Sequence, residues 1–293
     1  MGYSIRYHAA SLAAVFLALA IGILIGVGFG GDVLNNTKKD LEKSLTGDLE
    51  AARSHADDLA TQLDRSNEFA QRVYPVLVGH RLAGKRIGVV GLGALPNGVS
   101  SDIEAALAPT GGNLTEVAVV REPPDVPGVA QDLQATRFAK IRQDPGLIEA
   151  LGKGLGRQFV IGGPLLQRLR SKVLSRASGR FGGLDGLIVV RDQPANMSPH
   201  AQSQTDRIEA GILEGANRAG VPAVGVETTD AATSSVPFFS GRATASVDDL
   251  DQTSGQVALV FSLLGAEGNF GEKDTADRPL PDLLAPSPRP AGG

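Results

Sequence analysis

The first 83 residues show two hydrophobic patterns. Residues 9–31 are apolar on every side of a helix, with Ser11 as the only clearly polar side chain. About 20 apolar helical residues cross the hydrocarbon core of a bilayer. The pattern therefore predicts a single transmembrane helix behind a short flank, residues 1–8. A cleaved signal peptide is the alternative, although its apolar region runs over only about 7–15 residues.

Small residues recur at every fourth position of this apolar segment. The stripe consists of Ala10, Ala14, Ala18, Gly22, Gly26 and Gly30. Such a stripe lets two helix backbones approach closely and stabilises transmembrane dimers. Glycine and alanine are also common in membrane helices of other kinds. Because the stripe is unbroken over six positions, we expect a homodimer.

Residues 32–83 change to an amphipathic pattern. Apolar side chains recur three and four positions apart between residues 41 and 77, and Ser66 fills the one polar position of this seam. The spacing predicts a coiled-coil stalk. Pro75 disfavours helical geometry at Tyr74, the residue before it. Gly79 and Gly84 mark the exit from the stalk. The alternative is a lone amphipathic helix packed on the following domain.

Residues 84–266 alternate between buried strands and helices. We expect strands at 86–91, 114–120, 184–190, 223–226 and 243–247, and helices at 101–107, 145–151, 165–177, 202–219 and 254–264. Continuous apolar strands are typical of parallel sheets that are covered on both faces. The prediction is an α/β fold with a doubly wound (Rossmann/flavodoxin-like), mostly parallel sheet. Residues 267–293 are polar and end in a proline-rich stretch, which predicts a disordered tail.

Composition removes several function classes. The chain has no cysteine, so it has no disulfide framework, thiolate metal site or thiol nucleophile. Its net charge of -4 argues against nucleic-acid binding, which requires a basic surface. The four histidines are scattered, and Met197 with His200 is the only pair at the spacing of metal ligands. Two ligands are too few for a copper or zinc site. We therefore predict no enzyme, no cofactor and no bound metal.

Ligands of open α/β sheets bind beyond the carboxyl ends of the strands. The weak crevice candidates at these ends are Asn97, Asp192, Asn196 and Glu227. The alternative is that they are solvated loop residues. The first strand leads into Gly91-Leu-Gly93, which begins like a dinucleotide-binding motif but has proline where the third glycine belongs. A degenerate nucleotide-binding domain is therefore a second alternative.

Several stretches match a known family. Ile5-Arg-Tyr-His8 precedes the apolar segment, and Ala219-Gly-Val-Pro222 leads towards Ala245-Ser-Val-Asp248-Asp-Leu-Asp251. Gly255-Gln-Val-Ala-Leu-Val260 follows, and Asn269-Phe-Gly271 comes after the last predicted helix. Together these stretches resemble the actinobacterial MctB family, named as copper-transport outer-membrane proteins.

The resemblance implies a single-pass protein of the cell envelope that acts in copper transport or copper homeostasis, with its C-terminal domain outside the cytoplasm. The charges that flank the apolar segment do not fix this orientation. The residues themselves favour a dimeric, membrane-tethered scaffold or regulator whose α/β head binds a partner. The resemblance implies that this partner belongs to the envelope or division machinery. Conduction through the helix is a poor fit, because residues 9–31 offer no polar lining beyond Ser11.

Overall fold

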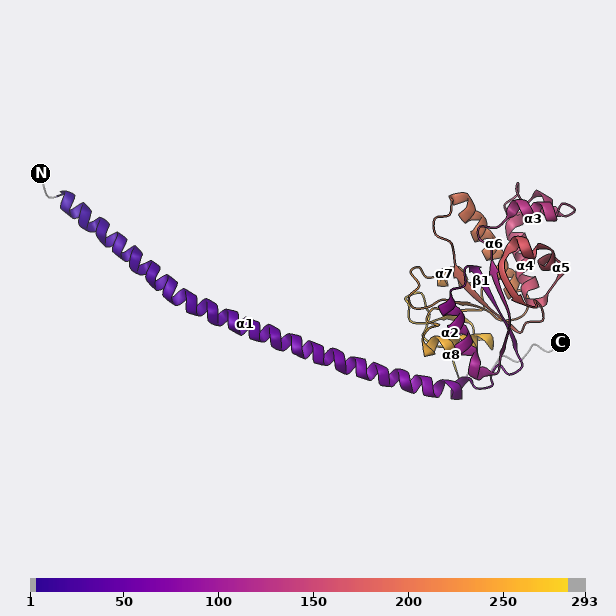
Figure 1. The fold of residues 1–293 in the computed structure, drawn as a ribbon, viewed down its shortest axis with the longest axis horizontal. Helices are drawn as coiled ribbons and strands as arrows, with labels where there is room; N and C mark the ends of the chain where they lie inside the picture. The colour runs from indigo at the N-terminus through magenta and orange to yellow at the C-terminus, as the bar shows by residue number, and fades with distance from the viewer. Residues whose placement is uncertain (1–3, 284–293) are drawn as a thin grey trace. The chain divides into compact units, whose positions relative to one another are not determined.

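The computed structural model describes residues 4–283, and the side-chain surroundings of residues 8–27 and 41–283. It divides into two compact units, Met1–Ser66 and Asn67–Gly293. We call the first the stalk unit and the second the head. Helix α1, Ser4–Val78, begins in the stalk unit and ends in the head (Figure 1).

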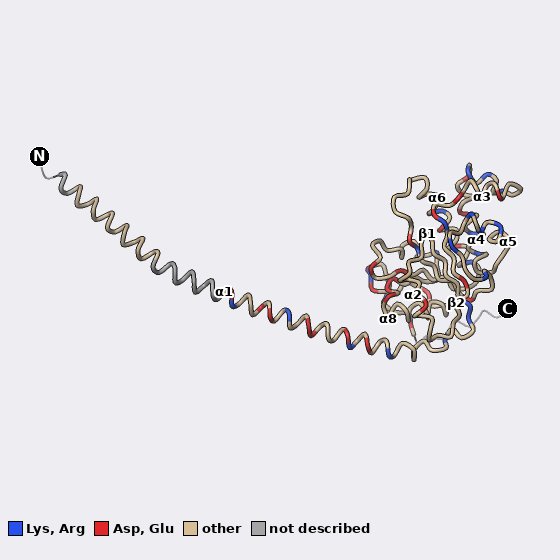
Figure 2. Tube along the Cα trace, in the orientation of Figure 1, with Lys and Arg blue, Asp and Glu red and all other residues tan. Residues whose placement is uncertain are grey.

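The stalk unit is a single helix with two kinds of surface. Among the described residues, His8–Val27 is the one segment long and apolar enough to cross a membrane, and it lies almost wholly within the predicted span. Lys, Arg, Asp and Glu follow it along the helix (Figure 2). The seam side chains Leu41, Leu45 and Leu63 remain 58% to 61% exposed. Within this unit, nothing covers the apolar seam.

The expectation that Pro75 disfavours helical geometry at Tyr74 is wrong, whereas the predicted exit at Gly79 agrees with Val78 as the last helical residue. Helix α1 continues through Pro75 to Val78. Tyr74 and Val78 are buried in the head, and the Tyr74 hydroxyl donates a hydrogen bond to the carbonyl oxygen of Ala106 at 2.6 Å. This packing outweighs the backbone hydrogen bond that proline removes. Residues 67–78 of α1 thus belong to the head unit.

The head is built on one seven-stranded sheet. Its strands are β1 Arg86–Gly93, β2 Asn113–Val120, β3 Leu174–Gly179, β4 Gly186–Asp192, β5 Ala223–Val226, β6 Ala245–Val247 and β7 Gly268–Phe270. Their order is β3-β2-β1-β4-β5-β6-β7, and β3 alone pairs antiparallel to its neighbour. The predicted α/β class with a mostly parallel sheet is confirmed.

Helices cover both faces of this sheet. They are α2 Asn97–Leu107, α3 Val126–Asp132, α4 Gly146–Ile161, α5 Pro164–Val173, α6 Pro199–Asn217, α7 Val236–Phe239 and α8 Thr253–Leu263, with short 3-10 helices η1 Ala108–Thr110 and η2 Arg137–Lys140. One hydrophobic core includes Phe159 of α4 and Ile212 of α6. The other includes Ile103 of α2, Leu259 of α8 and Val78 at the end of α1. Two separate cores show that the sheet is buried from both sides.

The structure corrects two predictions, one about a helix and one about the C-terminal tail. The helix expected over 165–177 ends at Val173, and Leu174–Gly179 forms the edge strand β3. This segment is polar and lacks the alternation of a strand, so its pairing with β2 decides its conformation. The tail expected to be disordered from residue 267 contributes β7, so that prediction is wrong up to residue 283. Residues 284–293 lie outside the described residues.

Helices α4 and α6 cross through glycines. Gly152 and Gly156 of α4 face Gly211 and Gly215 of α6. A Cβ on Gly156 would overlap the carbonyl oxygen of Ile212, and one on Gly215 would overlap that of Lys153. The two backbones therefore approach more closely than any side chain would permit, and α6 lies directly against α4.

Candidate functional site

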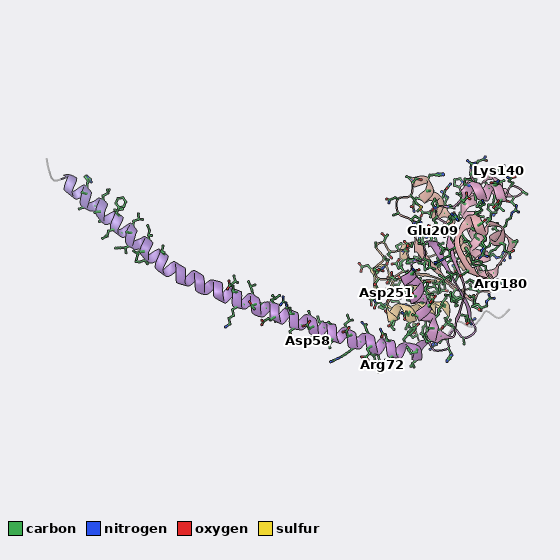
Figure 3. The ribbon with its side chains drawn as sticks, in the orientation of Figure 1. Asp58, Arg72, Lys140, Arg180, Glu209 and Asp251 are labelled. Atoms are coloured by element: carbon green, nitrogen blue, oxygen red, sulfur yellow. The ribbon has the colours of Figure 1, made fainter. Side chains whose placement is uncertain are left out.

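The central strands β1 and β4 end side by side at Gly93 and Asp192. Glu122, just after β2, lies against this point, since a Cβ on Gly93 would come within 2.8 Å of its Oε2. Gly93 has a φ of +86°, a conformation that glycine adopts readily. Glycine at this position therefore lets a carboxyl group approach the end of β1. Glu209 of α6, labelled in Figure 3, faces the same carboxyl group.

Glu209 is fully buried and belongs to a hydrogen-bonded group. Its Oε2 accepts from Nε of Arg191 at 2.9 Å and from Nε2 of Gln193 at 2.6 Å. Asp206 Oδ1 also accepts from Gln193 Nε2, at 3.0 Å. We call Glu122, Arg191, Gln193, Asp206 and Glu209 the carboxyl cluster. It joins the carboxyl ends of β2 and β4 to α6.

The electrostatics of the carboxyl cluster favour a bound proton. Burial, followed by the negative charge of Glu209, raises the pKa of Glu122 well above its usual range. Burial also raises the pKa of Glu209, although Arg191 opposes the shift. Neither oxygen of Glu122 accepts a hydrogen bond from a described donor, nor does Oε1 of Glu209. Two carboxyl groups this close do not both ionise. At neutral pH the pair therefore holds a proton.

A second polar group ties down the chain after β7. Lys273 Nζ donates to Glu227 Oε1 at 2.7 Å, and the amide of Ser235 donates to the other oxygen of Glu227. Asp248 Oδ1 accepts from the backbone amide of Glu272 at 2.9 Å. These contacts hold residues 272–273 over the carboxyl ends of β5 and β6. Glu227 therefore has a structural role, because both of its carboxylate oxygens accept hydrogen bonds from within the head.

The four predicted crevice candidates do not form one group. Asn97 is the exposed first residue of α2, Asp192 is exposed at the end of β4, and Asn196 is exposed before α6 with a φ of +64°. Among the described residues, no hydrogen bond joins any of them to another or to Glu227. The geometry instead gathers the carboxyl cluster.

Sequence reasoning missed Glu209 because it considered strand ends only. A signal was present on α6, where Thr205, Glu209 and Ile212 follow one another at spacings of four and three. This spacing places a carboxyl group on the buried face of the helix. An acidic residue at such a position needs a partner or a proton.

The described residues contain no group of three or more His, Cys, Asp or Glu able to hold a metal ion. Met197 and His200 have other partners. The hydroxyl of Thr205 donates to the Met197 sulfur at 3.6 Å, and His200 Nε2 lies 3.0 Å from Gln204 Nε2. Met197 and His200, the one pair that the sequence places at the spacing of metal ligands, thus contact different residues.

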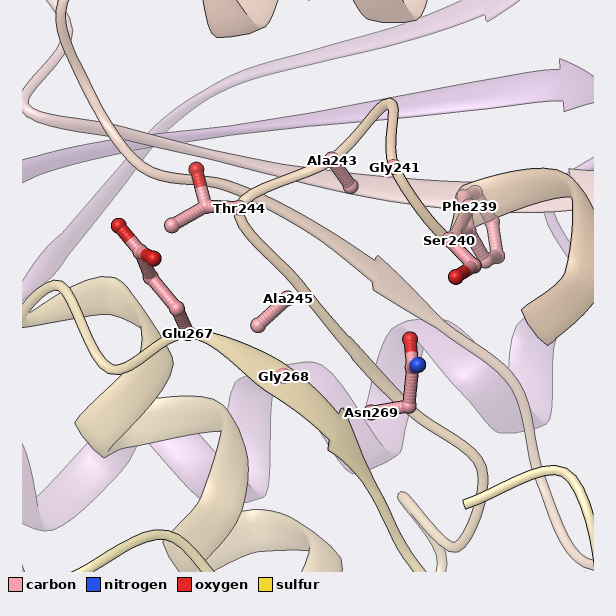
Figure 4. A pocket seen from close by; sticks show the side chains of 9 residues that line it. All are labelled: Phe239, Ser240, Gly241, Ala243, Thr244, Ala245, Glu267, Gly268 and Asn269. Atoms are coloured by element: carbon pink, nitrogen blue, oxygen red, sulfur yellow. The ribbon is translucent and has the colours of Figure 1, made fainter. Parts of the chain in front are cut away.

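A hollow of about 330 Å³ lies at the amino ends of β6 and β7 (Figure 4). It is lined by Phe239, Ser240, Gly241, Ala243, Thr244, Ala245, Glu267, Gly268 and Asn269. Glu267 is its one charged side chain, and most of the lining is backbone or small side chains. This composition offers no set of groups for acid–base chemistry or metal binding.

The sequence profile of the MctB family, described as copper transport outer membrane protein, matches residues 3–281. The chain belongs to the MctB family. The match includes both the apolar segment of α1 and the whole described sheet of the head. The resemblance drawn from the sequence motifs is thereby confirmed.

Curated MctB relatives match over shorter stretches. "Copper transporter MctB" of Mycobacterium bovis is 36% identical over 84 residues, which is 29% of this chain and 27% of the relative. "Copper transporter MctB" of Mycobacterium leprae is 52% identical over 42 residues, 14% of this chain and 13% of the relative. The aligned stretches thus span about a quarter or less of these relatives.

Proposed function

We propose that this chain acts in copper transport or copper homeostasis as a single-pass protein of the cell envelope, with its head on the extracytoplasmic side. The observation that carries the proposal is the family match over residues 3–281, which includes the segment able to cross a membrane and the head. The name carried by the curated relatives supports the same activity. The orientation rests on the description of the family.

Within this role, we assign the chain an assembly task, with no enzymatic step. A single apolar helix supplies no polar path for an ion. The described residues also lack a cluster of three metal-ligating side chains. Support for copper transport would then come from holding other components together. The partner we propose is a protein of the cell envelope, bound by the head.

Pairing of two copies through α1 is the second part of the proposal. Gly22 and Gly26 have no heavy atom within 4 Å beyond their own helix, which leaves room for a second backbone. Past the span, the seam of Leu41, Leu45 and Leu63 is exposed. Continuous apolar seams of this kind are buried by a partner helix in a coiled coil. A parallel homodimer would cover both regions.

The strand order supports a further detail of the fold. If the two edge strands β3 and β7 are set aside, the order β2-β1-β4-β5-β6 corresponds to the flavodoxin-like order of a doubly wound sheet. Degenerate nucleotide binding is the weaker functional alternative. The acidic side chains at the ends of β2 and β4 disfavour phosphate, and Pro96 occupies the N-cap of α2 without a side-chain cap hydrogen bond.

The test is complementation of a deletion strain in the organism of origin. We expect deletion to lower copper tolerance, and the full chain to restore it. Leu45→Glu with Leu59→Glu, which places charges in the seam, should restore it poorly, whereas Lys43→Glu outside the seam should restore it fully. Unchanged copper tolerance with altered cell shape would favour the alternative of a division scaffold. Unchanged tolerance and unchanged shape would overturn both.

A further inference from the structure

The head is strongly asymmetric in charge. Residues 137–180 contain ten Lys and Arg but two Asp and Glu, whereas residues 227–282 contain ten Asp and Glu but three Lys and Arg. The first segment includes the edge strand β3, and the second includes β7 at the opposite edge of the sheet. Figure 2 shows Lys and Arg gathered around α4 and α5, and Asp and Glu gathered beside α8. The net charge of -4 conceals this separation.

The basic edge consists of Arg137, Lys140, Arg168, Arg170, Arg176 and Arg180. All six side chains are exposed, and none forms an ion pair with a described carboxylate. Arg170 Nη2 donates to the carbonyl oxygen of Ala177 at 3.3 Å, which holds its guanidinium beside β3. Unpaired guanidinium groups bind carboxylates through two parallel hydrogen bonds. The basic edge therefore has unused capacity for acidic partners.

The acidic edge consists of Asp230, Asp251, Glu267, Glu272, Asp274 and Asp277. All six are exposed, and none forms an ion pair with a described Lys or Arg. Hydrogen bonds hold some of them in place, since Asp251 accepts from Thr229 at 2.6 Å and Asp277 accepts from the amide of Asn269 at 3.1 Å. These charges also act on Asp102. Burial is the largest cause of its raised pKa, and the negative charges of Asp251 and Asp230 raise the pKa further.

We propose that the basic edge of one head binds the acidic edge of a second copy of this chain. The two edges carry nearly equal and opposite charge, and they lie on opposite sides of the head. Figure 3 labels Lys140 and Arg180 on one side and Asp251 on the other. A contact between two different surfaces of the same chain forms a ring if the rotation between copies closes and an open row if it does not. Because the two edges lie on opposite sides of the head, we expect this contact to generate rows of heads. It is independent of pairing through α1, which joins identical surfaces.

The strength of this contact depends on the membrane. An exposed ion pair contributes only about 0.2–1 kcal/mol, and salt screens charges beyond roughly 8 Å at physiological ionic strength. The contact is therefore weak for chains free in solution. Confinement of anchored chains to one membrane raises their effective concentration, which favours weak contacts. Rows of heads form on the membrane and dissociate at high salt.

Because the chain has no cysteine, crosslinking can report this contact directly. The full chain is reconstituted into phosphatidylcholine vesicles at about 50 mM salt. Ser178→Cys marks β3 beside the basic edge, and Ala276→Cys marks the acidic edge. We expect a mixture of the two variants to crosslink at least several-fold more than either variant alone. The crosslink should be lost at about 500 mM salt.

Charge reversal makes the test specific. Arg168→Glu with Arg176→Glu should abolish the mixed crosslink, and pairing this variant with Asp274→Arg and Asp277→Arg on the other partner should restore it. Arg207→Glu, on an exposed part of α6 outside both edges, should change nothing. A separate Ala52→Cys variant reports stalk pairing, which should be insensitive to these reversals. Equal crosslinking of matched and mismatched edges would overturn the proposal. So would binding of the basic edge to phosphatidylglycerol vesicles without any contact between heads.

Discussion

Within the helices, glycines four residues apart occur in two regions, the apolar segment of α1 and the crossing of α4 with α6. In the head, Gly156 and Gly215 touch the backbone of the facing helix so closely that a Cβ would overlap it. In α1, Gly22 and Gly26 have nothing within 4 Å. The glycines of the head are thus covered by a facing helix, whereas Gly22 and Gly26 of α1 are uncovered.

A glycine spacing of four residues permits two helices to approach closely, but it does not by itself require a second helix. At the α4–α6 crossing, the close approach buries apolar neighbours such as Leu155 and Ile212, so the absence of a side chain is a condition of the fold. In a membrane, lipid can cover an open stripe, and a second helix is favoured only by the packing it gains. The head pair therefore serves as an internal reference for the stripe in α1.

The largest effect is expected at the occupied crossing. Gly156→Ala should lower the free energy of unfolding of the head by about 3 kcal/mol, because the added methyl group must displace the backbone of Ile212. Gly98→Ala is the matched control, since Gly98 of α2 has nothing within 4 Å and alanine favours a helix by up to about 1 kcal/mol. Hydrogen exchange of peptides from α4 and α6 measures both. Equal protection in the two variants would show that the crossing tolerates a side chain.

The parts of the fold predicted from sequence are those in which one local signal dominates. The apolar strands β1, β2, β4 and β5 were all expected near their observed positions, because a continuous apolar run leaves little choice. The strand β3 was missed, since Ser175 and Arg176 are polar and only pairing with β2 makes them a strand. Tyr74 and Val78 similarly override Pro75 through contacts distant in sequence.

The candidate site was less predictable for a related reason. Asn97, Asp192 and Asn196 follow strand ends, as the general rule requires, yet they are exposed and share no hydrogen bond. The carboxyl cluster depends on how α6 lies against the ends of β2 and β4, and this arrangement comes from the α4–α6 crossing. Sequence spacing could indicate that Glu209 is buried, but only the fold shows that it faces Glu122.

A smaller effect is expected in the open stripe. Gly22→Leu with Gly26→Leu should weaken association of the full chain in membranes about tenfold, which corresponds to about 1.4 kcal/mol. Leu24→Ile, on the opposite side of the helix, is the control. Crosslinking of the Ala52→Cys variant over a range of protein-to-lipid ratios measures association, and hydrogen exchange of the head should be unchanged. If association is the same in all three chains, the stripe faces lipid and the comparison with α4–α6 fails.

A third effect is expected in α6, because this helix carries Glu209 as well as the crossing glycines. It tests whether the glycines alone hold α6 in place. The pKa values of Glu122 and Glu209 are raised in the folded head, so between about pH 6 and pH 9 the folded state binds more protons than the unfolded state. Stability should therefore fall as pH rises through this window. Hydrogen exchange of α6 peptides, corrected for the intrinsic effect of pH, measures the change.

Glu122→Gln removes the titrating proton while keeping the size of the side chain. We expect this variant to lose the fall in α6 protection between pH 6 and pH 9, because a neutral amide beside Glu209 mimics the protonated acid at every pH. Glu104→Gln, on the exposed side of α2, should keep the pH dependence of the parent. If Glu122→Gln and Glu104→Gln give the same slope, the shared proton has no part in holding α6, and the glycine crossing alone accounts for its position.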